Sequence, residues 1–313
     1  DVKKVPDDLL TMDQNLSKDI ERSLYYLRFG HLSPKDLNDE YSSRIFDSYL
    51  KTLDPNKVYF TQKDIDKFEP YRDKLDDLIK RRNAEIAFDI FKVFRQRLSE
   101  RTEHIIELID TDFDFTKGES INIDRDSYAW SADQETVNEQ WRKRIKNDTL
   151  QGLMAKTPIK EVRENLKRRY NRQHDVIYQL KSEEVFEWFM NSFTRDLGPH
   201  TTYMSHVTAE NFEISMSLQL TGIGAALTTD EDYTVVSRII KGGPAEKSKA
   251  IKAEDKIVAV GQEGEDMINV IGWRLMDVVQ MIRGDKGTKV RLDVLPATNA
   301  PGSPPESLEF VRD

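Results

Sequence analysis

Hydrophobic residues recur at helical spacing through the first two thirds of this 313-residue chain. Leu37, Tyr41, Ile45 and Tyr49 lie four residues apart, and a second apolar stripe occupies residues 88–109. Residues three or four apart share one face of a helix, so both segments are predicted to be amphipathic helices. The second stripe consists of Phe88, Phe91, Phe94, Leu98, Ile105 and Ile109. Its aromatic content is typical of a core rather than of a cofactor pocket.

Capping residues predict where these helices begin and end. Ser33 and Pro34 are suited to an N-cap and a first helical turn, and Asp54-Pro55 marks the end of the first helix. Further helices are predicted over residues 135–146, 159–180 and 183–194. The stretch 110–131, with its Asp, Gly and Ser content, is predicted to be a long connection.

The pattern changes near Leu197, where Gly198 and Pro199 rule out a continued helix and β-branched residues become frequent. Strands are predicted at residues 233–236, 256–260, 290–295 and 308–311. A short helix is predicted to run from Pro244 to residue 251, and a longer one over 273–283 with its C-terminal stop at Gly284. The expected fold class is α+β multidomain: a mostly α-helical domain over 1–207, then a small sheet domain with two helices over 208–313.

Composition excludes several kinds of site. Net charge is -9, shared as -4 before Thr208 and -5 after it, so no basic domain points to nucleic acid. The chain has no cysteine, which excludes disulfides, zinc–thiolate sites and cysteine nucleophiles. The five histidines lack metal-ligand spacing, and no cofactor is expected. No run approaches the roughly 18 apolar residues of a membrane span.

The segment Leu220-Thr221-Gly222-Ile223-Gly224-Ala225-Ala226-Leu227 carries the clearest functional signal. Two glycines around one isoleucine let successive N–H groups point into a small concavity that suits a carboxylate. The apolar run after them reads as a strand whose edge could take an extended peptide. The dinucleotide pattern G-x-G-x-x-G fails because Leu227 stands at its third glycine. A glycine-rich hairpin entry without a ligand is the alternative.

Several segments resemble a known family. Gly222-Ile223-Gly224-Ala225 is similar to the carboxylate loop of PDZ domains in C-terminal-processing serine peptidases. Three later segments resemble further sequence signatures of the same domain: Gly243-Pro244-Ala245, Asp255-Lys256-Ile257 and residues 282–290. Residues 43–50, Leu53-Asp54-Pro55 and Pro199-His200-Thr201 resemble the helical amino-terminal part of the tail-specific protease (Prc/Tsp) subgroup. Two residues depart from the family pattern: Gly198 replaces an aspartate and Glu254 replaces a glycine.

The resemblance implies a serine-type endopeptidase with a Ser–Lys dyad, a periplasmic location and a signal peptide that was removed or left out. In the family the catalytic domain follows the PDZ domain, and this chain stops at Asp313, where the connection begins. We therefore expect it to bind the C-terminal tails of substrate proteins and to cleave nothing by itself. A lipoprotein adaptor is a further partner that the resemblance suggests. The alternative is a non-catalytic helical–PDZ scaffold, which a stop codon after Asp313 would favour.

The predicted tail groove combines the loop with one helix. The amides of Ile223, Gly224 and Ala225 are expected to hold the terminal carboxylate, and Ala225, Ala226 and Leu227 to pair with the peptide as an added strand. An apolar last residue is expected between the loop and a helix. The predicted peptide-binding residues are Gly222, Ile223, Gly224, Ala225, Ala226, Leu227, Leu275, Val279 and Ile282. Val278 and Met281 form a second apolar stripe on the same helix that could equally face the groove.

Three other motifs are given structural interpretations. Ser48-Tyr49-Leu50-Lys51 fits the S-x-x-K motif of penicillin-recognising enzymes. It lies in a predicted amphipathic helix, however, and the Ser-Asp-Asn and Lys-Thr-Gly motifs that accompany it in those enzymes are absent from the sequence. Arg283-Gly284-Asp285 is predicted to be a helix end and turn, not an adhesive tripeptide. The basic run of residues 163–172 is interrupted by Glu164, and it is predicted to be a solvated helix face.

Overall fold

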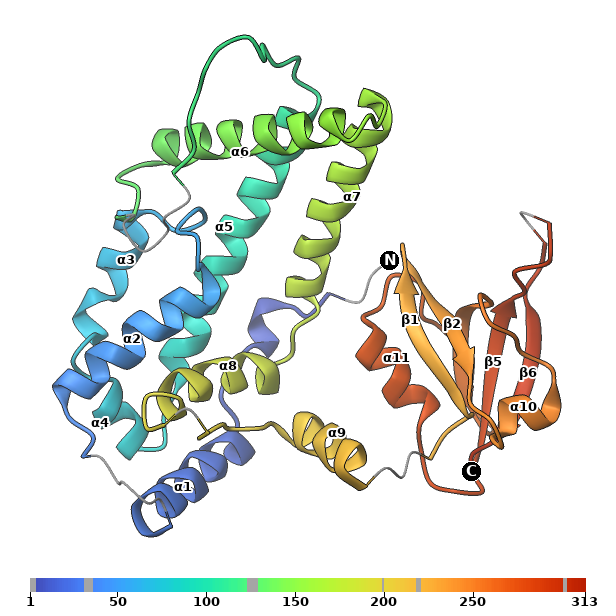
Figure 1. Ribbon diagram of the computed structural model, residues 1–313. Coiled ribbons are helices and arrows are strands. Elements are labelled where there is room, and N and C mark those ends of the chain that lie inside the picture. The colour runs from blue at the N-terminus through green and yellow to red at the C-terminus, as the bar shows by residue number, and fades with distance from the viewer. Residues whose placement is uncertain (1–3, 31–35, 123–128, 199, 218–220, 301–302) are drawn as a thin grey trace. The chain divides into compact units, whose positions relative to one another are not determined.

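The computed structural model describes residues 4–30, 36–122, 129–198, 200–217, 221–300 and 303–313. Within these residues the chain forms two compact units that divide between Val207 and Thr208. Figure 1 shows that the first unit is made of helices and that the second contains a sheet. The predicted α+β architecture is confirmed.

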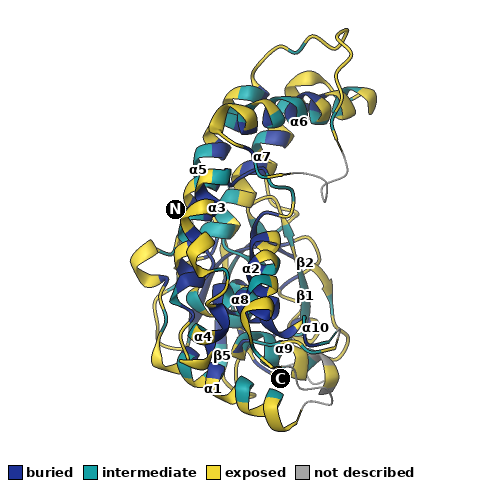
Figure 2. Cartoon of the chain, turned by 90° about the vertical axis from the view of Figure 1, so that its left-hand side faces the viewer, coloured by how far each residue is buried: buried dark blue, intermediate teal, exposed yellow. Residues whose placement is uncertain are grey.

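The first unit contains eight α-helices in the described residues, and a ninth begins at the division between the units. They are α1 (Gln14–Phe29), α2 (Asp39–Leu53), α3 (Gln62–Phe68), α4 (Leu75–Lys80), α5 (Glu85–Ile109), α6 (Gln134–Met154), α7 (Ile159–Tyr178), α8 (Ser182–Thr194) and α9 (His206–Ser217). The long helices carry a buried and an exposed face, as Figure 2 shows, because each packs only one side against the core.

The start of α2 differs from the prediction. Asn38 is its N-cap, and the side chain of Asn38 accepts a hydrogen bond from the amide of Tyr41 at 2.9 Å. Leu37 therefore precedes the helix instead of lying in its first turn. The predicted cap Ser33 and Pro34 lie outside the described residues. Asn caps a helix as well as Ser does, so the sequence offered two starts and the later one is used.

The predicted apolar stripes form the core of this unit. All six residues of the stripe on α5 are buried, with exposed fractions of 3% or less. The ring of Tyr49 on α2 meets Phe189 on α8 edge to face, with 5.3 Å between the ring centroids. The hydroxyl group of Tyr49 donates a hydrogen bond to the carbonyl of Ala87 at 3.0 Å, which satisfies the polar end of a buried ring.

Several helices differ from the sequence prediction. α6 continues eight residues beyond the predicted end at 146, and α7 ends two residues before the predicted 180. α1, α3 and α4 had no predicted counterpart. α9 was not predicted either, because its β-branched and polar residues give little apolar periodicity.

Asp54 organises the loop that follows α2. Its carboxylate accepts hydrogen bonds from the amides of Val58 at 3.0 Å, Tyr59 at 2.8 Å and Phe60 at 3.0 Å. The residue is only 1% exposed. Burial raises the pKa of Asp54, and the three amide donors oppose that rise because they stabilise the charged form. Asp54 therefore has a structural role in this loop.

Replacing Asp54 with alanine should destabilise the helical unit by about 2–4 kcal/mol, because three buried amides lose their acceptor. Urea unfolding followed by circular dichroism at the helical minimum would measure the change. The matched control is Asp66→Ala, which removes an exposed carboxylate from α3 and should cost less than about 0.5 kcal/mol. Equal stability of the two variants would contradict the structural role of Asp54.

The second unit is built on one antiparallel sheet. Its strands lie in the order β1 (Ala225–Asp230), β2 (Tyr233–Ile239), β3 (Lys256–Gln262), β5 (Lys289–Leu295) and β6 (Glu306–Val311), and β4 (Ile268–Asn269) pairs with β3. Two helices, α10 (Pro244–Ser248) and α11 (Leu275–Ile282), complete the unit. This order places β1 at one edge of the sheet, in contact with α11 (Figure 1).

The core of the second unit lies between the sheet and α11. Val290, Leu292 and Val294 alternate along β5 and are all buried, as the two-residue period of a strand requires. Val278 and Ile282 of α11 pack into the same apolar cluster. α11 is therefore fixed to the sheet by one of its faces.

Glu254 has a left-handed backbone with φ of 71°, which L-residues other than glycine rarely adopt. Its amide donates a hydrogen bond to the carbonyl of Val236 at 2.7 Å, so the turn is held by β2. This is the position at which the related proteins were expected to carry glycine. The glutamate that replaces the expected glycine at residue 254 therefore adds backbone strain at that residue but leaves the turn intact.

Glu254→Gly should stabilise the second unit by about 0.5–1 kcal/mol, because glycine adopts φ > 0 without the Cβ penalty. The control is Ala253→Gly at the neighbouring residue, which lacks a positive φ and should lose stability instead. Thermal unfolding of both variants provides the comparison. A destabilised Glu254→Gly would show that the glutamate side chain compensates for the strain.

Candidate functional site

The loop before β1 has bonded carbonyls and free amides. The carbonyl of Ile223 accepts a hydrogen bond from the amide of Ala245 at 2.8 Å, and the carbonyl of Gly224 accepts one from Ile240 at 2.9 Å. Among the described residues, no acceptor is bonded to the amides of Ile223 and Gly224. Two successive donors are thus left for an outside acceptor, which is the arrangement of an anion-binding nest.

The pairing of β1 with β2 adds a third donor. Ala225 lies opposite Ile239, and the bond from Ile240 to Gly224 flanks this pair. In an antiparallel ladder a pair flanked in this way is the non-hydrogen-bonded type. The amide of Ala225 therefore points toward the open edge of β1, in series with the two amides before it.

Gly222 belongs to the predicted peptide-binding set but has a different use. Its amide donates to the carbonyl of Asp313 at 3.4 Å, and its own carbonyl accepts from the amide of Asp313 at 3.1 Å. Its main chain is thus occupied within the fold. Gly222 anchors the loop, whereas Ile223, Gly224 and Ala225 supply the donors.

Gly224 is required at its position for two reasons. Its φ is 72°, in the left-handed region that favours glycine. A Cβ built on it would lie 2.8 Å from the Cα of Gly243 and 3.1 Å from the Cδ of Pro244. The loop before β1 and the turn before α10 therefore approach each other at two glycines, and this close approach allows the hydrogen bond from Ala245 to Ile223.

α11 contacts β1 (Figure 1). Its residues 275, 278, 279 and 282 have the i, i+3, i+4, i+7 spacing of one apolar helix face. Leu275 and Val279 lie one turn apart and are half-buried. By contrast, Val278 and Ile282 are fully buried in the core, at 0% and 3% exposure. Leu275 and Val279 thus keep accessible surface on a helix that contacts β1. Ile282 and the alternative residue Val278 support the helix from beneath.

The predicted apolar residues of the loop and strand divide in the same way. Ile223 is 2% exposed and packs into the core. Ala225, Ala226 and Leu227 are half-buried. A β-bulge interrupts the pairing with β2 between Ala226 and Leu227. Of the predicted peptide-binding residues, Ile223 and Ile282 are thus core residues, whereas Ala225, Ala226 and Leu227 keep accessible surface.

Two lysines and one aspartate meet at the base of the loop. The ammonium groups of Lys247 and Lys286 lie 3.3 Å and 2.5 Å from the carboxylate of Asp313. Lys286 in particular, followed by Lys247, lowers the pKa of Asp313. Two ammonium groups share this single carboxylate, so positive charge would add to the main-chain amides in favouring an anionic ligand.

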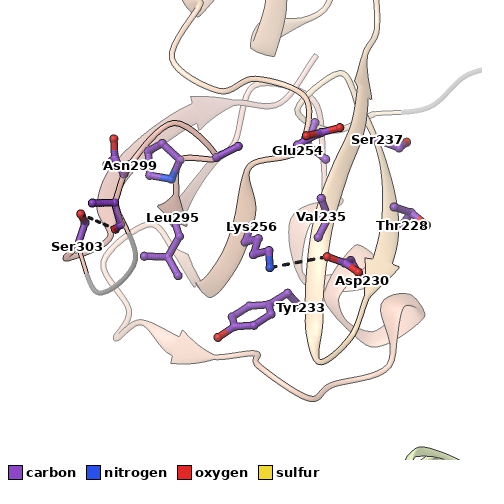
Figure 3. Close-up of a pocket in the computed structure, with 14 residues that line it drawn as sticks. Thr228, Asp230, Tyr233, Val235, Ser237, Glu254, Lys256, Leu295, Asn299 and Ser303 are labelled. Carbon is purple, nitrogen blue, oxygen red and sulfur yellow. Dashed lines mark hydrogen bonds and ion pairs between the residues drawn. The ribbon is translucent and has the colours of Figure 1, made fainter. Parts of the chain in front are cut away.

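A separate hollow of about 990 Å³ lies on the sheet, lined by β1, β2, β3 and the loop after β5 (Figure 3). The ammonium of Lys256 lies 3.7 Å from Asp230 and 4.7 Å from the ring centroid of Tyr233. None of the predicted peptide-binding residues lines this hollow. The sequence predicted strands at Tyr233 and Lys256 but not this hollow, because its walls come from segments far apart in the chain.

Ion pairs and hydrogen bonds within the fold account for parts of the remaining motifs. Arg163 binds Asp112 at 2.8 Å and Lys167 binds Asp110 at 2.7 Å, so part of the basic run holds the connection after α5. Arg283 donates to the side chain of Asn211 at 2.5 Å. In the described ranges, no three His, Asp or Glu side chains are placed to hold a metal ion. Nor is any described helix both long and apolar enough to cross a bilayer.

Two family models match the chain. The tail specific protease N-terminal domain matches residues 24–207, and the PDZ domain matches residues 212–295. The chain belongs to the tail-specific protease family. Gly222–Gly224 and α11 fall within the PDZ match, so the free amides described above lie in the PDZ domain of a tail-specific protease family member.

Individual relatives agree with this assignment. A tail-specific protease of Haemophilus influenzae is 36% identical over 294 residues, which cover 94% of this chain and 42% of that protein. The carboxy-terminal processing protease CtpA of Bacillus subtilis is 36% identical over 96 residues, 31% of this chain and 19% of the relative. The chain thus spans less than half the length of these relatives.

A solved structure is also similar in sequence. The PDZ domain of a carboxy-terminal protease from Vibrio cholerae, determined in complex with a peptide, is 49% identical, with a TM-score of 0.29. The match covers 30% of this chain and 94% of that one.

Gly224→Val should abolish the geometry of the loop, because a β-branched residue is excluded at φ of 72° and its Cβ would collide with Gly243. Binding of a free-acid tail peptide should weaken by about tenfold or more. The control is Gly222→Ala, since a Cβ there meets no described atom within 4 Å and the φ is not positive. Titration calorimetry of both variants tests the pair, and unchanged binding by Gly224→Val would remove the loop from the site.

Proposed function

We propose that this chain is the substrate-recognition part of a carboxyl-terminal processing serine protease, and that its PDZ groove captures the C-terminal tails of substrate proteins. The single observation that carries this proposal is the run of free amides at Ile223, Gly224 and Ala225 beside an open strand edge. A tail carboxylate is the ligand that such a run accommodates best.

The steps of recognition follow from the geometry. An extended tail adds to the edge of β1, and its carboxylate accepts hydrogen bonds from the loop amides. Each hydrogen bond to a charged group contributes about 1.5–3 kcal/mol. The last side chain rests near Leu275 and Val279, the half-buried face of α11. Main-chain pairing gives affinity without regard to sequence, and this apolar face favours apolar tail residues.

The proposal for the whole protein rests on the family. Its relatives are named as proteases, and the resemblance implies that a lysine, uncharged when it acts, takes the proton of a serine nucleophile. In that scheme, capture of a tail by the groove activates the Ser–Lys dyad. A periplasmic location and a lipoprotein adaptor belong to the same proposal and rest on the same resemblance.

Peptides ending in a free-carboxylate Ala or Val should bind this chain at least about tenfold more tightly than the same peptides amidated at the end. Amidation removes the charge that the loop amides accept, and a loss of about 1.4 kcal/mol is enough for that ratio. Fluorescence anisotropy with labelled peptides measures both affinities. Equal affinities would overturn the proposed role of the loop.

A further inference from the structure

Arg312 is buried beneath the groove helix. The residue is 3% exposed, and its guanidinium donates hydrogen bonds to five oxygen atoms. The acceptors are the carbonyls of Ile282 at 2.8 Å, Met281 at 3.2 Å and Lys289 at 3.1 Å, the hydroxyl group of Thr288 at 2.8 Å and the side-chain oxygen of Gln262 at 2.6 Å. None of these acceptors carries a formal charge.

The charge of Arg312 is balanced by the end of α11. Met281 and Ile282 are the last two residues of α11, and the final carbonyls of a helix lack partners within it and carry partial negative charge. A buried guanidinium at this place donates hydrogen bonds to these carbonyls, and its positive charge interacts favourably with their partial negative charge. Burial lowers the pKa of Arg312, but an arginine stays protonated at neutral pH.

Two neighbours complete this anchor. A Cβ on Gly284 would lie 2.9 Å from the Cζ of Arg312, so a side chain there would displace the guanidinium. α11 ends at Ile282 with Arg283 as its C-cap, within one residue of the predicted end, but Gly284 has no positive φ and instead makes room for Arg312. Gln262 also donates to the carbonyl of Met281 at 2.9 Å. The end of α11 is thus tied to β3 and β6.

The next residue, Asp313, holds the opposite wall. Its main chain exchanges two hydrogen bonds with Gly222, at the base of the loop that presents the free amides. Its carboxylate binds Lys247 of α10 and Lys286. Two consecutive residues after β6 therefore hold the helix on one side of the groove and the loop on the other.

We propose that Arg312 and Asp313 are positioning residues for the tail groove, so that tail affinity depends on the end of β6 being in place. The inference rests on the proposed tail binding. Because coupling between two sites is reciprocal, tail binding in turn steadies Arg312 and Asp313. A merely structural role for Arg312 would change the stability of the fold but not the affinity of the folded groove.

The test compares two variants of buried residues in the whole chain. Arg312→Gln removes most of the donors at the end of α11 and should weaken binding of a free-acid tail peptide by about fivefold or more, measured where the variant is still folded. The matched control is Asp255→Asn. Asp255 is 4% exposed, and its carboxylate accepts from the amides of Lys252 and Ala297, which belong neither to the loop before β1 nor to α11. It should lose stability but keep its affinity within about twofold.

Hydrogen exchange of the unaltered chain gives a second readout if Arg312→Gln fails to fold. The amide of Arg312 donates to Thr288 at 2.9 Å and that of Gly287 to Arg312 at 2.8 Å, so both report on the end of β6. Saturating free-acid peptide should slow exchange at both amides, and the amidated peptide should not. Unchanged exchange, unchanged affinity of Arg312→Gln, or equal weakening of both variants overturns the inference. Failure of the unaltered chain to bind either peptide overturns the proposed function instead.

Discussion

The close approach of Gly224 and Gly243 is the constraint on which the rest of the site depends. Only two residues without Cβ atoms can bring these backbone segments so near, and the contact lets Ala245 and Ile240 engage the carbonyls of the loop. With the carbonyls bonded inward, the amides of the same residues remain for a ligand. The turn before α10 thus creates the binding property of a loop twenty residues earlier.

α11 uses one broad apolar face, with its buried centre in the core and its half-buried edge at the surface. Val278 and Ile282 are sealed against the sheet, while Leu275 and Val279 stay half-exposed. A helix fixed from below offers a groove that is formed before a ligand arrives, which reduces the entropy lost on binding. The C-terminal end of this helix depends on Arg312, whose hydrogen bonds replace the partners that a helix end lacks.

Periodic features could be predicted from the sequence, and features set by distant contacts could not. The stripes on α2 and α5 were recognisable because burial repeats every three to four residues. The glycine loop was recognisable because its conformation is local. The start of α2 was misplaced since two good caps compete, and α9 was missed because its apolar residues follow no clear period.

The roles of individual site residues depended still more on long-range contacts. Nothing near Gly284 in the sequence indicates Arg312, 28 residues later, as the reason for a glycine. Likewise, the burial of Ile223 and Ile282 follows from the packing of α11 on the sheet, so the sequence could place them in the groove region but not decide which surface they present. Residue spacing in the sequence indicated where the candidate site lies, and tertiary packing decides which of its residues are buried.

The central claim is that the loop amides grip a terminal carboxylate, and nitrogen–proton correlation spectra recorded during a peptide titration test it most directly. A free-acid tail peptide should shift the amide protons of Ile223, Gly224 and Ala225 downfield as they form charge-assisted hydrogen bonds, and the amidated peptide should leave them near their starting positions. Binding of the free-acid peptide with no change at these three amides would contradict the account.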